Sequence, residues 1–536
     1  MKARILLGTL LVFILALCFG QQAFASHLKV DSVMIGEVNT ATKVAKVQCN
    51  VSWDNSWKDD INCDGVWIFA KYKAGDGTWK HITINAASGV VFDYADHAPV
   101  GFSKGTSADI GMWVPDEKKG IFLFRLNGKG SSVSQRVQLA WNYADEGITD
   151  EQIFKTQIKV FGFEMVYVPQ DKHYIGDPKG PDGPDNAFYT YPNNGAYLIG
   201  SEDPITVDAV DGALYCDQDN PRSREDAPFT IPAEFPKGYK AFWMMKYELT
   251  SQQFVDFLNT LTRKQQQSMV ESDISADEIK NYYVKTDSEE EHLRNAVVVA
   301  KRGNGTIEPV KFFTYAPARA VSFMSWSNIA AIGDWAGLRP ITELEYEKAC
   351  RGPKDPVVDE AAWGTTEAGR VETFDGADGS GYEKKIPQTG LVNACFGGGI
   401  APFDVGKKTV PDNPGFEGPV SGEVFENSRH EGILEKINDG ASYYGVRNLS
   451  GNLWERCVTV GHTLGRAYTA LHGDGMLDAD GFADVVNWPG KDGAGAGNRG
   501  GVWSSPAFKY LRFALRFAAN FPKSEDGKNS GCRLGF

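Results

Sequence analysis

The first part of the chain carries a strand pattern. Apolar residues alternate with polar ones from 136 to 142, which is the period of a half-buried strand. The run Gly65–Lys73 is rich in aromatic and β-branched residues, and a Gly-Asp-Gly turn separates it from a second such run, Trp79–Ile84. This pattern predicts a hairpin. Short strands at such spacing indicate an N-terminal β-sandwich over residues 26–158.

Beyond residue 158 the pattern becomes mixed. The segments Glu164–Pro169 and Phe242–Tyr247 read as strands, and a long polar stretch rich in Gly, Pro and Asp separates them. Residues 264–310 are polar and charged and look like an insertion. We therefore expect a second domain over 159–536, with few regular elements and long loops.

Three hydroxyl residues, Thr250, Ser325 and Thr342, stand at the expected N-caps of helices. Thr250 and Thr342 are each followed three residues later by Gln or Glu, which is the pattern of a capping box. The helix after Ser325 is expected to stop at Gly337, and the helix after Thr342 near Arg351. Strands and helices together place the chain in the α+β class.

Length and charge narrow the picture. The chain has 536 residues, which is more than one core usually supports, so two or three domains are expected. The formal net charge is -14. Such an acidic chain argues against nucleic acid as a partner, because phosphates repel it.

The N-terminus, residues 1–25, reads as a signal peptide. It has a basic start, an apolar run too short to span a bilayer, and an Ala-Phe-Ala site for cleavage after Ala25. An alternative is a lipoprotein modified at Cys18, although Leu17 stands where a small residue is expected. We expect a secreted, periplasmic or cell-surface protein without a transmembrane segment.

Seven cysteines follow the predicted signal peptide, so at least one is unpaired within the chain. None forms a CxxC pair or a Cys/His cluster with zinc spacing. Cys49 and Cys63 flank a Trp-rich segment and are candidates for a disulfide, which an exported protein permits.

Eight segments, in this order, resemble the formylglycine-generating enzyme (sulfatase-modifying factor) family. They are FEMVYVP at 163, FWMMKYELTSQQFVDFLN at 242, PARAVSFMSW at 317, DWAGLRPITELEYEKACRGP at 334, AWGTT at 362, YGVRNLSGNLWER at 444, NRGGVWSS at 498 and GCRLGF at 531. The resemblance covers roughly residues 160–536. It implies a variant of the C-type lectin fold.

The resemblance also implies a chemistry that this chain has lost. Family enzymes use oxygen to convert a sulfatase cysteine to formylglycine, with copper(I) held by two cysteines five residues apart. The matching positions here are Ser505 and Tyr510, and the sequence has no cysteine between Cys457 and Cys532. Hydroxyls are poor ligands for copper(I), which selects soft sulfur. Copper and the family's oxidase activity are therefore not expected.

A calcium site is better preserved. In the family, the side chains at the positions of Asn448 and Glu455 and the carbonyls at Gly451 and Leu453 bind calcium, and hard oxygen donors suit that ion. The alternative is that Asn448 and Glu455 only satisfy loop amides. A neighbouring acidic loop from Asp474 to Asp484 is interpreted as solvated rather than as a second metal site.

Family members also suggest a second disulfide. In some of them the cysteine at the position of Cys350 pairs with one in the final strand, at the position of Leu534. This chain has Cys532 instead, which lies on the same face of a strand, so a Cys350–Cys532 bridge is expected. The alternative is that Cys350 is a buried free thiol.

These observations favour a non-catalytic protein that binds a glycan, peptide or protein ligand where the family's active site lay. The expected walls of its pocket combine aromatic rings with hydroxyls. They are Trp503, Ser504, Ser505, Phe508 and Tyr510. The alternative for these residues is simple packing of the last strands.

Two other functions remain open from the sequence. The C-terminal segment also resembles the variable regions of proteins diversified by retroelements. The variable positions would be Val502, Ser504, Ser505, Ala507 and Tyr510. Alternatively, the protein is a formylglycine-generating oxidase whose copper site has been rebuilt from other cysteines.

Overall fold

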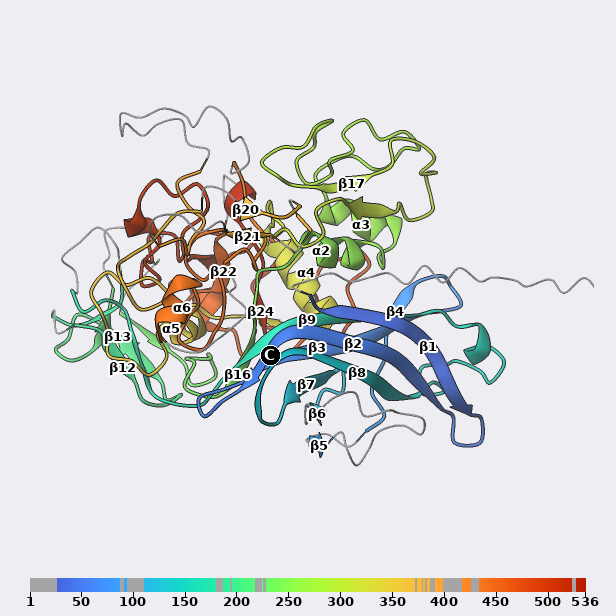
Figure 1. The fold of residues 1–536 in the computed structure, drawn as a ribbon, viewed down its shortest axis with the longest axis horizontal. Helices are drawn as coiled ribbons and strands as arrows, with labels where there is room; N and C mark the ends of the chain where they lie inside the picture. The colour runs from blue at the N-terminus through green and yellow to red at the C-terminus, as the bar shows by residue number, and fades with distance from the viewer. Residues whose placement is uncertain are drawn as a thin grey trace, which may run out of the picture.

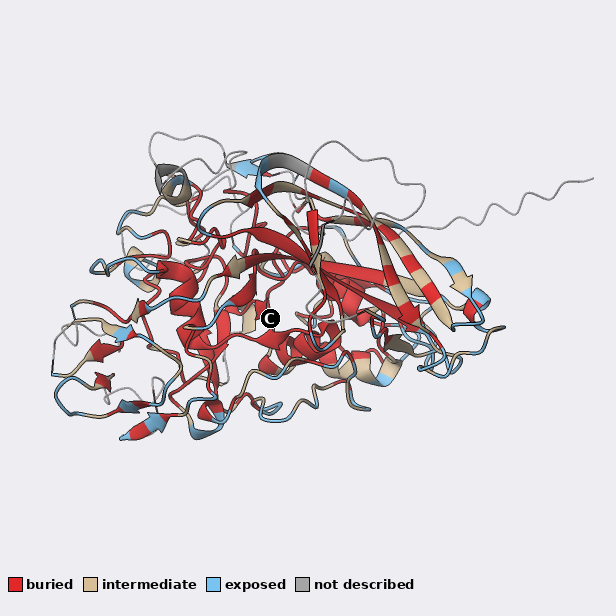
Figure 2. Cartoon of the chain, turned by 90° about the horizontal axis from the view of Figure 1, so that it is seen from below, coloured by how far each residue is buried: buried red, intermediate tan, exposed pale blue. Residues whose placement is uncertain are grey.

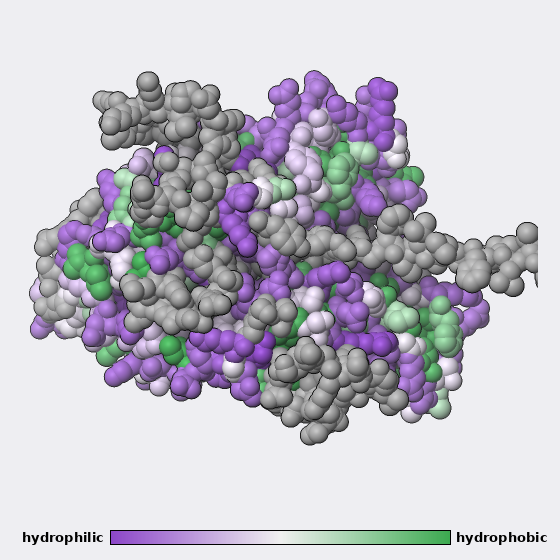
Figure 3. All heavy atoms as spheres, in the orientation of Figure 1, coloured by the Kyte–Doolittle hydropathy of each residue, from purple (hydrophilic) through white to green (hydrophobic). Residues whose placement is uncertain are grey.

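The computed structural model describes most of the chain. It covers residues 27–86, 91–93, 110–179, 187–192, 195–216, 224, 228–371, 374–377, 379–380, 383–385, 391–398, 417–425, 433–522 and 527–536. The predicted signal peptide, residues 1–25, lies outside the described residues, as does Cys18. None of the helices in the described ranges is both long and apolar enough to cross a membrane. On the face seen in Figure 3, hydrophilic side chains predominate and the hydrophobic ones form small separate patches.

A nine-stranded sheet runs through the protein and joins its two halves (Figure 1). Strand β9 pairs with β3 on one side and with β16 on the other. The predicted domain boundary at residue 158 coincides with the start of β9, so the sheet is continuous across it. The order of the sheet is β19 (Arg339–Pro340), β24 (Leu534–Gly535), β16 (Phe242–Met245), β9 (Ile158–Val168), β3 (Asp64–Lys73), β7 (Ile121–Arg125), β6 (Ile110–Trp113) and β5 (Val91–Asp93), with β4 (Trp79–His81) beside β3.

A second, three-stranded antiparallel sheet packs on the N-terminal strands of the first. It consists of β1 (Lys29–Asn39), β2 (Val44–Lys58) and β8 (Gly128–Asn142). Alternate residues of β3, Val66 and Ile68, share a core with residues of β2 and β8. The predicted alternation at 136–142 lies in β8, and the predicted hairpin is formed by β3 and β4.

The opposite face of β3 carries Trp67 and Phe69, which pack in a different core. That core includes residues of helices α2 (Ser251–Leu258) and α4 (Trp326–Ala336). The two expected capping boxes are present on α2 and on α5 (Glu343–Arg351). Helix α4 begins after the expected cap, Ser325, with a capping box that Asn328 completes, and Gly337 ends it in the left-handed region at φ 68°. Local side-chain to backbone hydrogen bonds thus fix where these three helices begin.

The expected insertion, 264–310, is less separate than its polarity suggests. Helix α3 (Arg263–Met269) and strand β17 (Val297–Val299) lie within it or at its edge, and β17 pairs with β18 (Phe312–Thr314). Its few apolar side chains, including Ile274 and Val284, are buried in the same core as α2. These contacts attach the segment firmly to the rest of the fold.

The C-terminal half has few regular elements, yet many of its side chains are buried (Figure 2). Charged side chains replace part of the missing backbone pairing. Glu343 accepts hydrogen bonds from Arg499 and Arg516, both at 2.7 Å, and all three side chains are buried. Buried ion pairs of this kind are costly to break by removing one partner.

The remaining elements of this half are short. They are β10 (His173–Ile175), β11 (Tyr189–Thr190), β12 (Tyr197–Ile199), β13 (Ile205–Val207), β14 (Leu214–Tyr215), β15 (Phe229–Ile231), β20 (Phe374–Asp375), β21 (Lys384–Lys385), β22 (Glu455–Val458), β23 (Ala496–Arg499), α6 (Ile433–Asn438), α7 (Thr463–Arg466) and the 3-10 turns η3 (Phe508–Tyr510) and η4 (Gly527–Asn529). A further 3-10 turn, η1 (Ile153–Lys155), precedes β9.

Both expected disulfides are absent from the structure, where all seven described cysteines are free and buried. Cys49 packs between the two sheets, whereas Cys63 belongs to the core on the other face of the nine-stranded sheet. Cys350 and Cys532 likewise lie in different cores. Their positions correct both pairings, because flanking a segment or sharing a strand face does not bring two thiols together.

Asp256, a buried carboxylate of α2, makes stability depend on pH. It accepts a hydrogen bond from Gln252 Nε2 at 2.9 Å, and burial raises its pKa to about 7. In the unfolded chain the pKa is about 3.9. The folded state therefore keeps a proton that the unfolded chain releases, so this carboxyl lowers the free energy of unfolding as pH rises from about 4 to about 7.

We expect the variant Asp256→Asn to lose that pH dependence, because the amide keeps the acceptor oxygen and cannot ionise. Relative to the wild type, its free energy of unfolding should rise by roughly 1–4 kcal/mol between about pH 4.5 and about pH 7.5. Urea unfolding of both proteins at the two pH values measures this. A difference that stays constant with pH would contradict the assignment.

Candidate functional site

Ser505 stands where the family has its first copper-binding cysteine, and its hydroxyl is already engaged. The side chain is 6% exposed, and its Oγ accepts a hydrogen bond from the backbone N–H of Val502 at 2.9 Å. Its carbonyl accepts a second bond from Gly397 N–H at 2.8 Å. Ser505 therefore closes a tight turn and joins it to a neighbouring loop.

Trp503 is a core residue and does not line an open ligand pocket. It is 2% exposed and packs against Val420, Phe425 and Leu453, among other apolar side chains. Together with the buried Ser505 it corrects the expectation that all five predicted residues face a ligand. For these two the alternative interpretation, packing of the last segments, describes the structure.

Ser504, Phe508 and Tyr510 are the predicted ligand-binding residues that reach the surface, each partly exposed. Ser504 Oγ donates to Asn529 Oδ1 at 3.0 Å, and the ring of Tyr510 meets that of Phe517 at a centroid distance of 6.2 Å. The hydroxyl of Ser504 is thus engaged by Asn529, while the two rings remain partly exposed.

The positions expected to vary in a diversified protein do not form one exposed face. Val502 and Ser505 are buried, Ser504 and Tyr510 are partly exposed, and Ala507 is exposed. Variation at a buried position disturbs the packing around it rather than a ligand contact.

The loop before β22 closes on a residue that the sequence did not point to, Glu248. One of its oxygens, Oε1, accepts the backbone N–H of Leu453 at 3.0 Å, and Oε2 accepts the side-chain amides of Asn448 and Asn452. The available signal is weak: in the segment FWMMKYELT, Glu248 stands three residues after the apolar strand β16 and two residues before the helix cap Thr250.

Glu455 completes a pair of buried carboxylates. Its Oε1 accepts a hydrogen bond from Arg533 Nε at 2.7 Å, whereas its buried Oε2 has no partner among the described residues. Burial and the charge of Glu455 raise the pKa of Glu248 to about 8, and burial also raises the pKa of Glu455. Repulsion between the two buried carboxylates thus favours a proton or a cation at the pair, while Arg533 bonds to Glu455.

These residues fit a calcium ion. Carboxylate and amide oxygens are its preferred ligands, and the orphaned oxygen of Glu455 is a buried acceptor without a donor. Gly451 has φ 97°, and a Cβ there would lie 2.7 Å from the carbonyl oxygen of Cys395, so the loop needs glycine at this point. The alternative interpretation is that Asn448 and Glu455 satisfy loop amides; the amide of Asn448 donates to Glu248, whereas Glu455 Oε2 accepts no hydrogen bond among the described residues.

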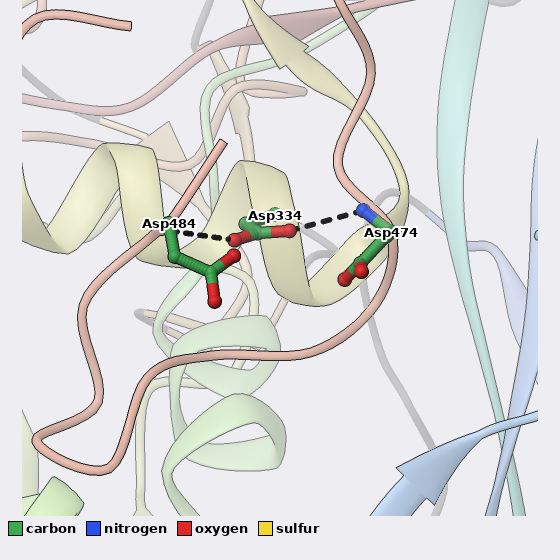
Figure 4. Close-up of side chains that lie close together, drawn as sticks. All are labelled: Asp334, Asp474 and Asp484. Atoms are coloured by element: carbon green, nitrogen blue, oxygen red, sulfur yellow. Dashed lines mark hydrogen bonds between the residues drawn. The ribbon is translucent and has the colours of Figure 1, made fainter. Parts of the chain in front are cut away.

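A second acidic group brings Asp334 of α4 to the loop from Asp474 to Asp484 (Figure 4). Asp334 accepts the backbone N–H groups of Asp474 at 3.0 Å and Asp484 at 3.2 Å, one with each oxygen. Burial raises the pKa of Asp334 to about 7. Because both oxygens are used by backbone donors, this carboxyl anchors the loop to α4, and Asp474 and Asp484 are exposed beside it.

The position of Glu248 predicts a graded loss of stability. The variant Glu248→Ala leaves the buried N–H of Leu453 without an acceptor, at a cost of roughly 1–3 kcal/mol, and takes from the amide of Asn452 one of its two acceptors, the other being the carbonyl of Val420. Glu248→Gln keeps one acceptor oxygen and should lose less. Urea unfolding measures both, with the exposed Glu234→Ala as control. A loss for Glu248→Ala as small as that of the control would contradict this role.

The comparisons with known proteins agree with the geometry. The family described as "Sulfatase-modifying factor enzyme 1-like domain" matches residues 208–534. No curated protein matches the chain significantly. The match covers the helices α2, α4 and α5, the loop before β22 and the turn at Ser505, which is more than half of the chain. The protein therefore belongs to the sulfatase-modifying factor family.

Proposed function

We propose that this protein is a non-catalytic, ligand-binding member of its family, stabilised by calcium. The observation that carries the proposal is the state of Ser505. At the position of a copper ligand the chain has a hydroxyl that is buried and accepts a backbone N–H. Tyr510, at the position of the second ligand, offers only a phenol, and copper(I) needs soft sulfur donors.

The alternative, an oxidase with a rebuilt site, requires thiolates elsewhere. Cys350, Cys395 and Cys457 are the described cysteines of the central C-terminal cores, and each is buried. Burial raises the pKa of Cys395 to about 12 and the pKa values of Cys350 and Cys457 well above the usual range. Thiols in such surroundings resist the deprotonation that copper binding requires.

The partly exposed surface of Ser504, Phe508 and Tyr510 is the proposed ligand face for a glycan, peptide or protein. Rings beside a hydroxyl suit such ligands. The proposal includes a C-type lectin variant for the C-terminal half and a β-sandwich before it. The packing of the three-stranded sheet on β3 and β7 supports the sandwich.

Export and partners belong to the same proposal. The signal-peptide pattern of residues 1–25 supports a secreted, periplasmic or surface location. The net charge of -14 supports a protein that does not bind nucleic acid.

Calcium would be held by Asn448, Glu455 and Glu248, with the carbonyls of Gly451 and Leu453. When bound, it supplies charge neutralisation between two buried carboxylates. The chain's own residues position the ligands: Glu248 accepts hydrogen bonds from the loop amides, and Arg533 donates to Glu455.

The oxidase question is tested by oxygen consumption with a Cys-x-Pro-x-Arg peptide and copper(I). We expect no peptide oxidation by the wild type or by Ser505→Ala. The double variant Ser505→Cys, Tyr510→Cys restores the two sulfur positions and serves as the matched comparison. Peptide oxidation by the wild type that persists in Ser505→Ala would contradict the proposal and indicate a site rebuilt elsewhere.

The calcium site is tested by thermal unfolding with calcium and with a chelator. Calcium at a hundredfold excess over its Kd should add about 2.7 kcal/mol to the free energy of unfolding. Glu455→Gln should abolish this gain, because it removes a charged ligand. Asp484→Asn, in the other acidic group, should keep it. If calcium still stabilised Glu455→Gln but no longer stabilised Asp484→Asn, calcium would lie beside Asp334 and the assignment would be contradicted.

A further inference from the structure

A cavity of about 960 Å³ lies at the junction of the N-terminal strands with β16 and β24, away from the segment 502–510. Aromatic side chains from five places in the sequence line it. They are Trp113, Phe124, Tyr167, Trp243 and Phe536. A cavity of this size accommodates a small organic ligand.

These rings form one connected apolar wall. Trp243 lies 5.2 Å from Tyr167 and 6.1 Å from Phe124, between ring centroids. Trp113 meets Phe536 edge-on at 5.8 Å. Trp113, Phe124 and Tyr167 remain partly exposed, so their surfaces are available to a flat apolar ligand.

Arg125, at the end of β7, places a positive charge in this wall. The residue lines the cavity and is 5% exposed, and its buried Nε has no hydrogen-bond partner among the described residues. Asp64 is the opposite charge that acts on it, but Asp64 accepts hydrogen bonds from Ser56 and Trp57 and lies 3.5 Å from Lys246. A buried guanidinium N–H without an acceptor is costly, and a ligand carboxylate on Nε would relieve that cost.

The other cationic groups that line the cavity are Lys58, Lys240 and Arg339, and His472 lines it as well. Lys58 Nζ donates to the carbonyl of Asp59 at 2.6 Å, and Lys240 is exposed to solvent. Arg339 already makes two hydrogen bonds to Glu345. His472 lies with Nδ1 2.8 Å from Glu117, and its ring stacks on Phe536 at 3.9 Å. Its buried Nε2 has no partner among the described residues, which leaves it available to a polar group of a ligand.

We propose that this cavity binds a small aromatic carboxylate, with its ring against the aromatic wall and its carboxylate on Arg125. The lining also includes polar and charged residues, among them Asn62, Glu202, Glu234, Glu345 and Thr469, but the rings form its largest apolar surface and favour an aromatic ligand. This site is distinct from the ligand face at 502–510, so it stands or falls independently of that face.

Calorimetric titration with 2-naphthylacetate and its neutral analogue 2-(2-naphthyl)ethanol tests the proposal. The carboxylate should bind at least about tenfold more tightly, since hydrogen bonds to charged groups contribute roughly 1.5–3 kcal/mol. In Arg125→Met the affinity for the carboxylate should fall to that for the alcohol. Alcohol binding that is retained shows that the variant is folded.

Two exposed alanines give matched blocking variants. Ala241 lines the cavity, so Ala241→Trp should abolish binding of both probes, whereas Ala507→Trp, in the segment 502–510, should leave it unchanged. Binding lost in Ala507→Trp but not in Ala241→Trp would overturn this inference and support the other ligand face. Equal affinity for the two probes, or binding of neither, would also overturn it, and the oxygen-consumption result would stand unaffected.

Discussion

One buried guanidinium, that of Arg533, holds three distant parts of the C-terminal half together. It donates to Glu455, to the carbonyl of Met245 on β16 and to the carbonyl of Arg447, each at 2.7 Å. Few backbone ladders cross this region, so such charge-assisted bonds determine where the loops lie. Arg533 also fixes the position of Glu455, one of the two buried carboxylates at the proposed calcium site.

The parts of the fold that could be predicted from the sequence are those fixed by near neighbours. The capping boxes at Thr250 and Thr342 involve residues three apart, and both helices begin where expected. The nine-stranded sheet could not be predicted in this way. Its pairing of Trp67 with Phe163 joins residues far apart in sequence, and strand periodicity does not reveal the partner. The sequence pattern indicated two separate domains, whereas the nine-stranded sheet takes strands from both of them.

In the candidate site, too, local features could be predicted from the sequence and long-range contacts could not. The family segments directed attention to the turn at Ser505 and to the loop from Asn448 to Glu455, and their site roles stay predictions. They could not show that Trp503 is buried, because exposure depends on loops folded over it. Glu248 is about 200 residues from the loop it holds, so local spacing could not assign it. The cavity around Arg125 is assembled from still more distant segments, and no motif marks it.

The most direct test of the central claim, that the family's oxidative site is absent, is a copper(I) titration against a competing chelator. The account predicts that the purified wild type removes no stoichiometric copper from the chelator, because Ser505 offers a bonded hydroxyl and the described thiols are buried in apolar cores. Capture of one equivalent of copper(I) would contradict it. That result would mean that buried cysteines come together as thiolates in solution.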